Sequence, residues 1–403
     1  MTEQHHIQLT GEAVKLIKMP DYVGPMAFGV KMGVILPGMD IVEKVLESLE
    51  QCSKDGLLAG GDVVCVTESV VARSQDNYVT LDHIAREIGE KLQLAEDSKI
   101  AVVFPIASRN RFSMIMKGIA RAVPKGEVVV QLSFPTDEVG NVVIAPSFAA
   151  QLGKDPITAD DLKDLSFKHP LTGVDYINLY REIIASEGAV PTVILSNNPL
   201  QTIEYSPDGI IVADIHRRHK TLEQITGWHE NCITLDQVCN EGVVRSEWGL
   251  LGSNMSAGER LKLAPRDGQK VVEELQAKVK SRLGIDLEVM IYGDGAYLDP
   301  SSGIYELADP RAAFAATKGL DCYREGLKYK FLADQCFHEE LKNAAEIEVI
   351  MAESIRRDLP ADALVKEGTT PRKMEDVLAS LADLISGSAD AGTPVVIVRG
   401  FLR

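Results

Sequence analysis

IAVVFPIASRNRFSMIMKGIARAVPKGEVVVQLSFPTDEVGN, residues 100–141, contains two runs of apolar, mostly β-branched residues separated by a segment with polar residues. Each run, Ile100–Phe104 and Val128–Phe134, is long enough for a buried strand. We expect the two strands to form one hairpin-like unit with charged loops at its ends. The fold class that this stretch and similar ones predict is mixed α/β (α+β), with buried sheets and flanking helices.

Polar residues follow both predicted strands. Ser108-Arg109-Asn110-Arg111 places two guanidinium groups beside a hydroxyl and an amide, and Asp137-Glu138 places adjacent carboxylates just before Gly140. Arginine suits anionic oxygens, and clustered carboxylates suit a hard divalent cation. The unit therefore offers both halves of a site for a phosphorylated, metal-bound ligand. The alternative is a solvated loop with charge pairs.

The overall composition excludes several classes of protein. The chain has 403 residues, 45% hydrophobic and 25% charged, with a formal net charge of −17, so we expect no nucleic-acid partner. Its N-terminus lacks the apolar core of a signal peptide, and no apolar run is long enough to cross a membrane. The 6 cysteines include no C-x-x-C pair, which argues against zinc and favours reduced thiols in a cytoplasmic protein.

Other strand ends and turns also carry polar groups. The strand Val63–Val66 runs into Thr67–Arg73, and a second buried strand ends at Asp214, followed by His216. In an extended segment Asp214 and His216, at i and i+2, share a face and reach one ion. The alternatives are a capping threonine at Thr67 and a basic helix start at His216.

Two further loops and one long helix complete the prediction. The Gly- and Asp-rich segment 292–300 suits a cation or a phosphate, or is a routine turn, and residues 386–394 are a small-residue loop or a plain connection. Residues 258–283 show a helical pattern that is broken near Pro265. We expect a first part, residues 1–285, with the nucleotide and metal site, and a C-terminal part, residues 286–403, that completes the fold.

Four motifs, in this order, give the chain its resemblance to a known family. They are T-E-S-V-V-A-R at 67–73, S-R-N-R-F at 108–112, D-E-V-G-N at 137–141 and Y-G-D-G-A at 292–296. Together they resemble the coenzyme F420-0:L-glutamate ligase (gamma-glutamyl ligase) family, most closely its longer bacterial ligase-like subgroup. The resemblance implies a GTP- (or ATP-) and divalent-metal-dependent ligase, with Mg²⁺ or Mn²⁺, that is a homodimer.

The resemblance also implies roles for single residues. Asp137 and Asp214 fall on metal-binding positions, although the family's Asp-Thr pair is here Asp214-Ile215. The nucleotide-binding positions are Glu68, Ser69, Arg73, Asn141, Gly387, Ser388, Asp390, Gly392 and Thr393. Arg73 replaces a lysine, which keeps the charge and changes its geometry.

The implied reaction joins L-glutamate to a carboxylate of a small-molecule acceptor through an acyl phosphate. Arg109, with Arg111 and Arg73, neutralises phosphate or acceptor oxygens, and Glu138 and His216 are the two candidates for the general base. Two other functions stay open. One is a metal-dependent phosphohydrolase, and the other is a non-catalytic nucleotide-binding descendant of the ligase fold.

Overall fold

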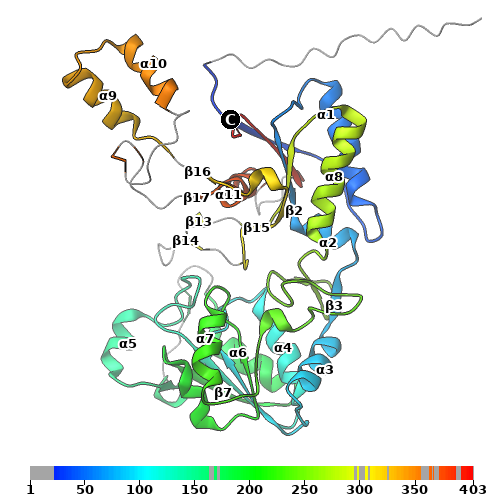
Figure 1. Cartoon of the computed structure of the whole chain (residues 1–403). Helices are drawn as coiled ribbons and strands as arrows, with labels where there is room; N and C mark the ends of the chain where they lie inside the picture. Colours follow the sequence, from blue (N-terminus) through cyan, green and yellow to red (C-terminus); the bar gives the residue numbers. More distant parts are fainter. Residues whose placement is uncertain are drawn as a thin grey trace, which may run out of the picture.

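The computed structural model forms two lobes, each built around its own sheet (Figure 1). It describes residues 22–162, 168–169, 173–294, 297–298, 305–306, 309–324, 326–354, 363–364, 366, 372–386 and 392–402. Sheets with helices on their faces confirm the predicted mixed α+β class.

The first lobe contains a six-stranded sheet of order β6-β7-β5-β4-β8-β9, in which only the edge strand β6 is antiparallel to its neighbour. Its strands are β4 (Lys99–Val103), β5 (Glu127–Leu132), β6 (Ile157–Thr158), β7 (Val190–Leu195), β8 (Gly209–Val212) and β9 (Cys232–Thr234). Its helices are α3 (Leu81–Lys91), α4 (Phe112–Ala122), α5 (Pro146–Leu152), η1 (Ala159–Leu162), α6 (Tyr176–Ser186), η2 (Pro199–Tyr205), α7 (Arg218–Thr226) and η3 (Leu235–Gln237).

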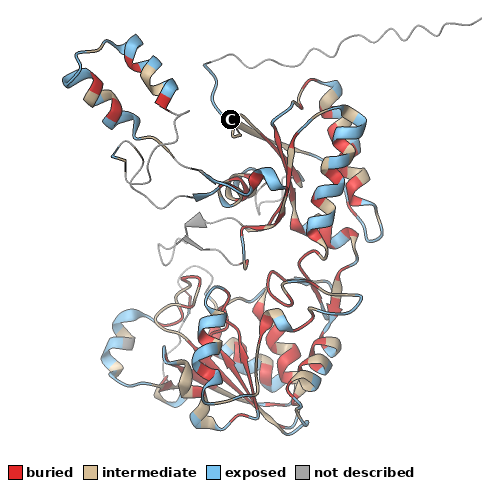
Figure 2. Cartoon of the chain, in the orientation of Figure 1, coloured by how far each residue is buried: buried red, intermediate tan, exposed pale blue. Residues whose placement is uncertain are grey.

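Strand periodicity explains how both faces of this sheet are covered. Ile100 and Val102 of β4 lie in the cluster formed with α3, α4 and α6, whereas Ala101 and Val103 lie in the cluster formed with α7 and η2. Alternate side chains of a strand point to opposite faces, so a strand that is buried on both sides is continuously apolar. Buried residues therefore fill both sides of the sheet (Figure 2).

The predicted hairpin of residues 100–134 is wrong, although both strands exist. β4 and β5 pair in parallel, with Ile100 opposite Val128, and α4 connects them. Parallel neighbours need a crossover connection, and the segment 112–122 is long and apolar enough to provide one as a helix on the sheet. Both charged loops therefore lie at the same edge of the sheet.

The second lobe contains a five-stranded sheet of order β1-β18-β2-β12-β15. Its strands are β1 (Met26–Val30), β2 (Val63–Thr67), β12 (Glu288–Tyr292), β15 (Ala313–Ala316) and β18 (Val395–Arg399), and its helices are α1 (Ile41–Lys54), α2 (Glu68–Ser74), α8 (Gly268–Leu283), η4 (Lys318–Leu320) and α11 (Met374–Ser386). Helices α1 and α8 cover one face, and α11 covers the other.

The N- and C-terminal parts of the chain meet in this sheet. β2 pairs in parallel with β12 and antiparallel with β18, so strands from the end of the chain complete a sheet begun near its start. The boundary predicted at residue 285 stays a prediction. It falls between α8 and β12, and Val272 of α8 and Val289 of β12 belong to one apolar cluster.

A three-stranded sheet lies between the two larger ones (Figure 1). It consists of β3 (Tyr78–Thr80), β10 (Asn254–Ser256) and β11 (Arg260–Lys262). The predicted helix over residues 258–283 is therefore wrong before Pro265 and correct after it. Leu261 is fully buried and pairs with Val79, because the strand alternation and the partner strand β3 outweigh the weak helical period there.

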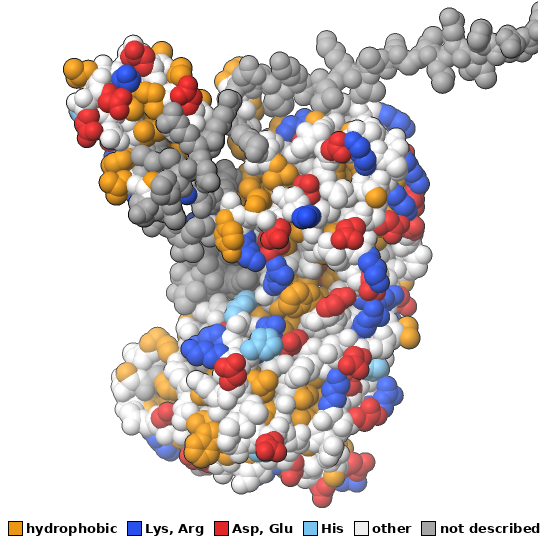
Figure 3. Space-filling model, in the orientation of Figure 1, with side chains coloured by type: hydrophobic (Ala, Val, Ile, Leu, Met, Phe, Trp, Pro, Cys, Tyr) orange, Lys and Arg blue, Asp and Glu red, His pale blue; other side chains and the backbone are white. Residues whose placement is uncertain are grey.

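A pair of helices, α9 (Tyr329–His338) and α10 (Ala344–Ser354), packs on itself around Leu332, Cys336 and Ile347. Hydrophobic side chains are visible on its surface (Figure 3). Phe337 and Val349 are among its exposed hydrophobic residues. The remaining short strands are β13 (Tyr297–Leu298), β14 (Tyr305–Glu306), β16 (Tyr323–Arg324) and β17 (Arg372–Lys373). Within the described parts of the chain, no helix has the length and apolar content that a membrane crossing requires.

Candidate active site between two sheet edges

Asp137 organises the loop that follows β5. Its Oδ1 accepts the backbone N–H groups of Val139 (3.1 Å) and Asn141 (2.8 Å), and its Oδ2 accepts those of the Ala107 backbone (2.7 Å) and the Asn141 side chain (3.0 Å). Burial raises the pKa of Asp137, and the bond from Asn141 opposes this. These four bonds use the lone pairs of both oxygens. A metal at Asp137 would have to displace one of them.

Glu138 connects that loop to the one that follows β8. Its carboxylate accepts the backbone N–H groups of Ile215 and His216, and that of Arg217 at 3.2 Å. Burial raises the pKa of Glu138, and the bond from His216 opposes this rise. Glu138 therefore holds the backbone immediately after Asp214.

Asp214 is the buried carboxylate with unused bonding capacity at this edge. Its side chain is fully buried, Oδ2 accepts the hydroxyl of Thr221, and Oδ1 has no hydrogen-bond partner within the described structure. Burial raises the pKa of Asp214 to about 6, with the nearby Glu138 carboxylate contributing in the same direction. A buried oxygen without a partner is costly, and a cation or a proton would satisfy it.

The shared face predicted for Asp214 and His216 does not form. β8 ends at Val212, so the two-residue alternation does not continue through Asp214. Asp214 is buried, whereas the His216 side chain is exposed. The alternative that His216 precedes a basic helix agrees with α7, which begins at Arg218.

The structure nevertheless brings most of the sequence-predicted residues of this lobe to one edge. β4 lies between β5 and β8, and all three run in the same direction, so the loops that carry Arg109, Asp137 and Asp214 leave the same edge of the sheet. Carboxyl-terminal edges of parallel sheets are common ligand sites. Phe104, the residue after β4, has a left-handed backbone (φ 56°), a strained conformation that often accompanies such sites.

Arg111 joins this edge to the second lobe. Its Nη1 donates to Oδ1 of Asp309 at 2.7 Å, and its Nη2 donates to Asp294. Burial by itself lowers the pKa of Arg111, but the carboxylates of Asp309 and Asp294 raise it overall. Arg109, two residues earlier, is exposed. The two arginines of the motif therefore have different roles.

Glu68 and Lys262 form a second buried ion pair in the same region. Lys262 Nζ lies 2.7 and 2.6 Å from the two oxygens of Glu68, and both side chains are less than 10% exposed. Burial raises the pKa of Glu68, and the Lys262 ammonium opposes this. Glu68 begins α2, at the end of β2, so the carboxyl edge of β2 also carries charge into the space between the lobes.

Asp294 and Asp309 belong to the same group of charges. The backbone N–H of Asp294 donates to Oδ2 of Asp309 at 2.8 Å. Burial raises the pKa of Asp294, and the Asp309 carboxylate adds to the rise. We refer to five residues as the interlobe charge cluster: Glu68, Lys262, Arg111, Asp294 and Asp309. Lysine, arginine and histidine side chains are also visible where the lobes meet on the face shown in Figure 3.

The predicted nucleotide-binding residues of the second lobe lie at this edge as far as the structure describes them. The backbone N–H of Thr67 donates to the carbonyl of Pro394 at 2.9 Å, which places Gly392 and Thr393 beside the start of α2. Ser69 and Arg73 are exposed on α2, and Thr393 Oγ1 is buried without a hydrogen-bond partner among the described residues. Gly387, Ser388 and Asp390 lie outside the described residues.

Sequence reasoning missed two members of the interlobe charge cluster, Lys262 and Asp309. Lys262 falls in the segment that was expected to be helical, and its strand position explains its burial beside Glu68. Asp309 precedes β15 in a region without a recognisable motif.

The two sheet edges carry groups that suit different ligands. Two sheets present their polar edges to one another, one with a cation-compatible carboxylate at Asp214 and the other with small residues at Gly392 and Thr393. A protein-family model described as F420-0:Gamma-glutamyl ligase matches residues 29–400.

The chain belongs to the F420-0:gamma-glutamyl ligase family. The match spans both sheets, so the family fold comprises the two lobes together. Membership in this ligase family identifies the general reaction as carbon–nitrogen bond formation of the gamma-glutamyl type. No curated protein matches the sequence.

Proposed function

We propose that this chain is a nucleotide- and divalent-metal-dependent ligase that joins L-glutamate to a carboxylate of a cofactor-like acceptor. The observation that carries the proposal is the bond from Arg111 to Asp309, because it brings the acidic edge of the six-stranded sheet to the edge that carries Glu68 and Thr393. Ligation needs an acid, an amine and a phosphoryl donor in one place, and the two edges provide separate surfaces for them.

The reaction proceeds in two steps. The acceptor carboxylate attacks the γ-phosphorus of GTP or ATP, which forms an acyl phosphate and releases the nucleoside diphosphate. The amine of glutamate then attacks the acyl carbon, an amide bond forms, phosphate leaves, and the amine proton passes to a base. Both steps depend on positioning and charge neutralisation more than on covalent chemistry by the protein.

A divalent cation is held, in this proposal, by Asp214. The orphaned Oδ1 of that residue fits a cation, and when bound, Mg²⁺ or Mn²⁺ neutralises phosphate oxygens. Asp137 was expected as a second ligand, but its oxygens are engaged in four hydrogen bonds. We propose that Asp137 and Asn141 chiefly shape the loop.

The exposed guanidinium groups of Arg73 and Arg109 neutralise phosphate or acceptor oxygens, because Arg111 is already engaged by two carboxylates.

For the general base we favour His216 over Glu138. His216 is exposed at the edge, whereas the Glu138 carboxylate is occupied by three backbone N–H groups.

The homodimeric state and the cytoplasmic location remain predictions, and light scattering of the purified chain tests the first.

The test is a mass-spectrometric search for products that gain one glutamyl residue. The purified chain is incubated with GTP or ATP, Mg²⁺ or Mn²⁺, glutamate and a panel of carboxylate acceptors that includes a deazaflavin and a folate. Phosphate release that requires both glutamate and an acceptor supports the ligase. Release without either identifies a phosphohydrolase, and nucleotide binding without turnover identifies a binding protein; either result overturns the proposal.

A further inference from the structure

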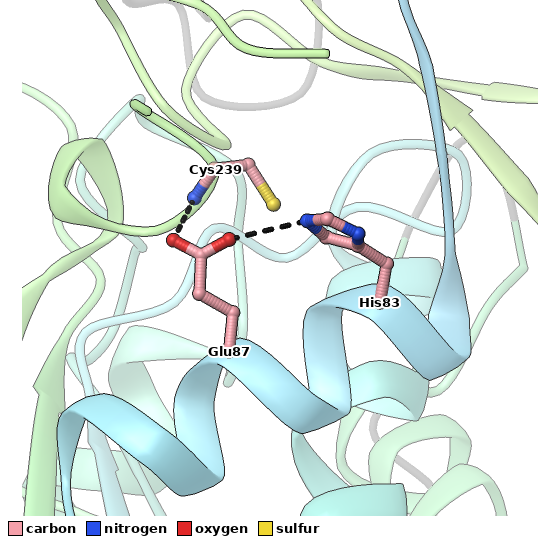
Figure 4. A group of neighbouring side chains, drawn as sticks. All are labelled: His83, Glu87 and Cys239. Atoms are coloured by element: carbon pink, nitrogen blue, oxygen red, sulfur yellow. Dashed lines mark hydrogen bonds and ion pairs between the residues drawn. The ribbon is translucent and has the colours of Figure 1, made fainter. Parts of the chain in front are cut away.

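Three side chains of different chemistry converge beside α3, and none of them is among the residues proposed for ligation. His83 and Glu87 lie one turn apart on α3, and Cys239 follows η3 (Figure 4). One donor atom from each of these residues lies within 4.8 Å of the other two. An imidazole, a carboxylate and a thiol so close together form a potential ligand set.

Backbone and side-chain bonds fix the orientation of these donors. Glu87 Oε1 accepts the backbone N–H of Cys239 at 2.8 Å and lies 3.0 Å from Lys91 Nζ. The other oxygen, Oε2, faces His83 Nε2 at 3.4 Å. Since Oε1 is engaged, Oε2 and Nε2 are the atoms presented towards the Cys239 sulfur (Figure 4). Cys239 itself has a left-handed backbone (φ 60°), which its surroundings must sustain.

These separations can be compared with those of a metal site. Tetrahedral zinc bonds of roughly 2.0–2.3 Å place neighbouring ligand atoms about 3.6 Å apart. The His83–Glu87 separation of 3.4 Å already matches, and the limit of 4.8 Å for the set requires shifts of about an ångström in side chains that can rotate. We infer that His83, Glu87 and Cys239 bind one Zn²⁺ ion, with water in the fourth position.

The ligand chemistry selects zinc over the harder cations. Thiolate and imidazole prefer Zn²⁺, whereas Mg²⁺ and Mn²⁺ prefer oxygen. Cys239 is fully buried, and the His83 side chain is 36% exposed, so the open position faces solvent on the histidine side. Burial, and then the Glu87 carboxylate, raises the pKa of the Cys239 thiol.

The ion would connect two distant parts of the chain. Glu87 and Cys239 are 152 residues apart in sequence, and only hydrogen bonds and packing link them in the described structure. A ligand that binds the folded chain and not the unfolded one stabilises it by mass action. We therefore assign the ion a structural role, which does not depend on the proposed ligase reaction.

Cobalt titration of the chelator-treated full chain tests the site, because a thiolate bound to Co²⁺ gives an ultraviolet charge-transfer band. We expect this band in the parent protein and in Cys322→Ser, which removes an exposed thiol elsewhere. We expect no band in Cys239→Ser and at least a tenfold weaker Zn²⁺ affinity in His83→Gln, which changes a partly exposed side chain. Asp214→Asn should keep the band, which separates this site from the one proposed for ligation.

Arg86 provides a variant that should bind more tightly. Its Nη2 lies 3.1 Å from His83 Nδ1, and a metal on Nε2 requires a proton on Nδ1, which a guanidinium opposes and a carboxylate favours. Arg86→Glu should therefore raise Zn²⁺ affinity by about tenfold. The inference is overturned if the parent protein gives no thiolate band, if Cys239→Ser gives the same band, or if His83→Gln binds Zn²⁺ as tightly as the parent.

Discussion

Arg111 Nη1 lies 2.7 Å from Oδ1 of Asp309, 198 residues further along the chain and in the other lobe. The same guanidinium also bonds to Asp294. Asp309 is almost fully buried, and Arg111 is only 16% exposed, so solvent screens these charges little. The Arg111 side chain therefore determines much of how the two polar edges meet.

Arg111→Met should destabilise the protein and impair ligation. The substitution leaves the buried Asp309 carboxylate without its cation, which typically costs about 3 kcal/mol. We expect that loss in urea unfolding and a more than tenfold loss of ligase turnover. Arg121→Met is the matched control, because Arg121 also pairs with carboxylates, but with three others, Asp82, Glu187 and Glu259. It should cost under about 1 kcal/mol and leave turnover intact; equal effects of the two variants contradict the assignment.

Glu68 and Lys262 should show strong coupling in a double-mutant cycle. Lys262→Met strands the Glu68 carboxylate, and Glu68→Gln strands the Lys262 ammonium, so each single change should cost about 3 kcal/mol in the free energy of unfolding. The double variant removes both buried charges and should cost clearly less than the sum. Additive effects would mean that the pair is not an energetic unit.

Asp214→Asn should abolish Mn²⁺ binding and metal-dependent turnover while leaving the fold intact. The substitution removes the charge that a cation needs and retains an oxygen that can accept the Thr221 hydroxyl. Calorimetric titration with Mn²⁺ and turnover measurements give the readouts. Thr221→Val, which keeps the carboxylate, is the control and should retain binding. Normal turnover in Asp214→Asn would remove Asp214 from the metal site.

Asp214 should also make the stability of the metal-free protein depend on pH. Its folded-state pKa of about 6 lies above the roughly 3.9 of an unfolded Asp, so the folded chain holds the proton more tightly. The stability contributed by protonated Asp214 is complete below pH ~4 and is lost as the pH rises through about 6, a change of about 3 kcal/mol. Urea unfolding in chelator should show this decline relative to Asp214→Asn. A difference between the two proteins that does not change with pH contradicts it.

Much of the local structure could be predicted from short segments. The apolar runs of β2, β4 and β5 form strands where the sequence indicates them, and α8 forms after Pro265. Such elements depend on propensity, periodicity and caps, which neighbouring residues determine. The segment 258–264 was predicted incorrectly because its strand needs Val79 as a partner across the chain.

Only part of the candidate site could be predicted from the sequence. The motifs indicated Glu68, Asp137 and Asp214, because polar residues that directly follow buried strands stand out in a sequence. They did not indicate that Asp137 accepts four hydrogen bonds and Asp214 Oδ1 none. The partner Ala107 lies on a different loop from Asp137, and Thr221 of α7 bonds only to Oδ2 of Asp214.

The sequence by itself determined the fold class, several buried strands, the helix after Pro265, the family resemblance and the polar strand ends. Only the tertiary structure decided that β4 and β5 run parallel, that Arg111 reaches Asp309, and that Lys262 neutralises Glu68. The physical reason is distance along the chain: these contacts join residues that local propensity cannot relate, and they form because burial of both sheets leaves their charged edges facing one another.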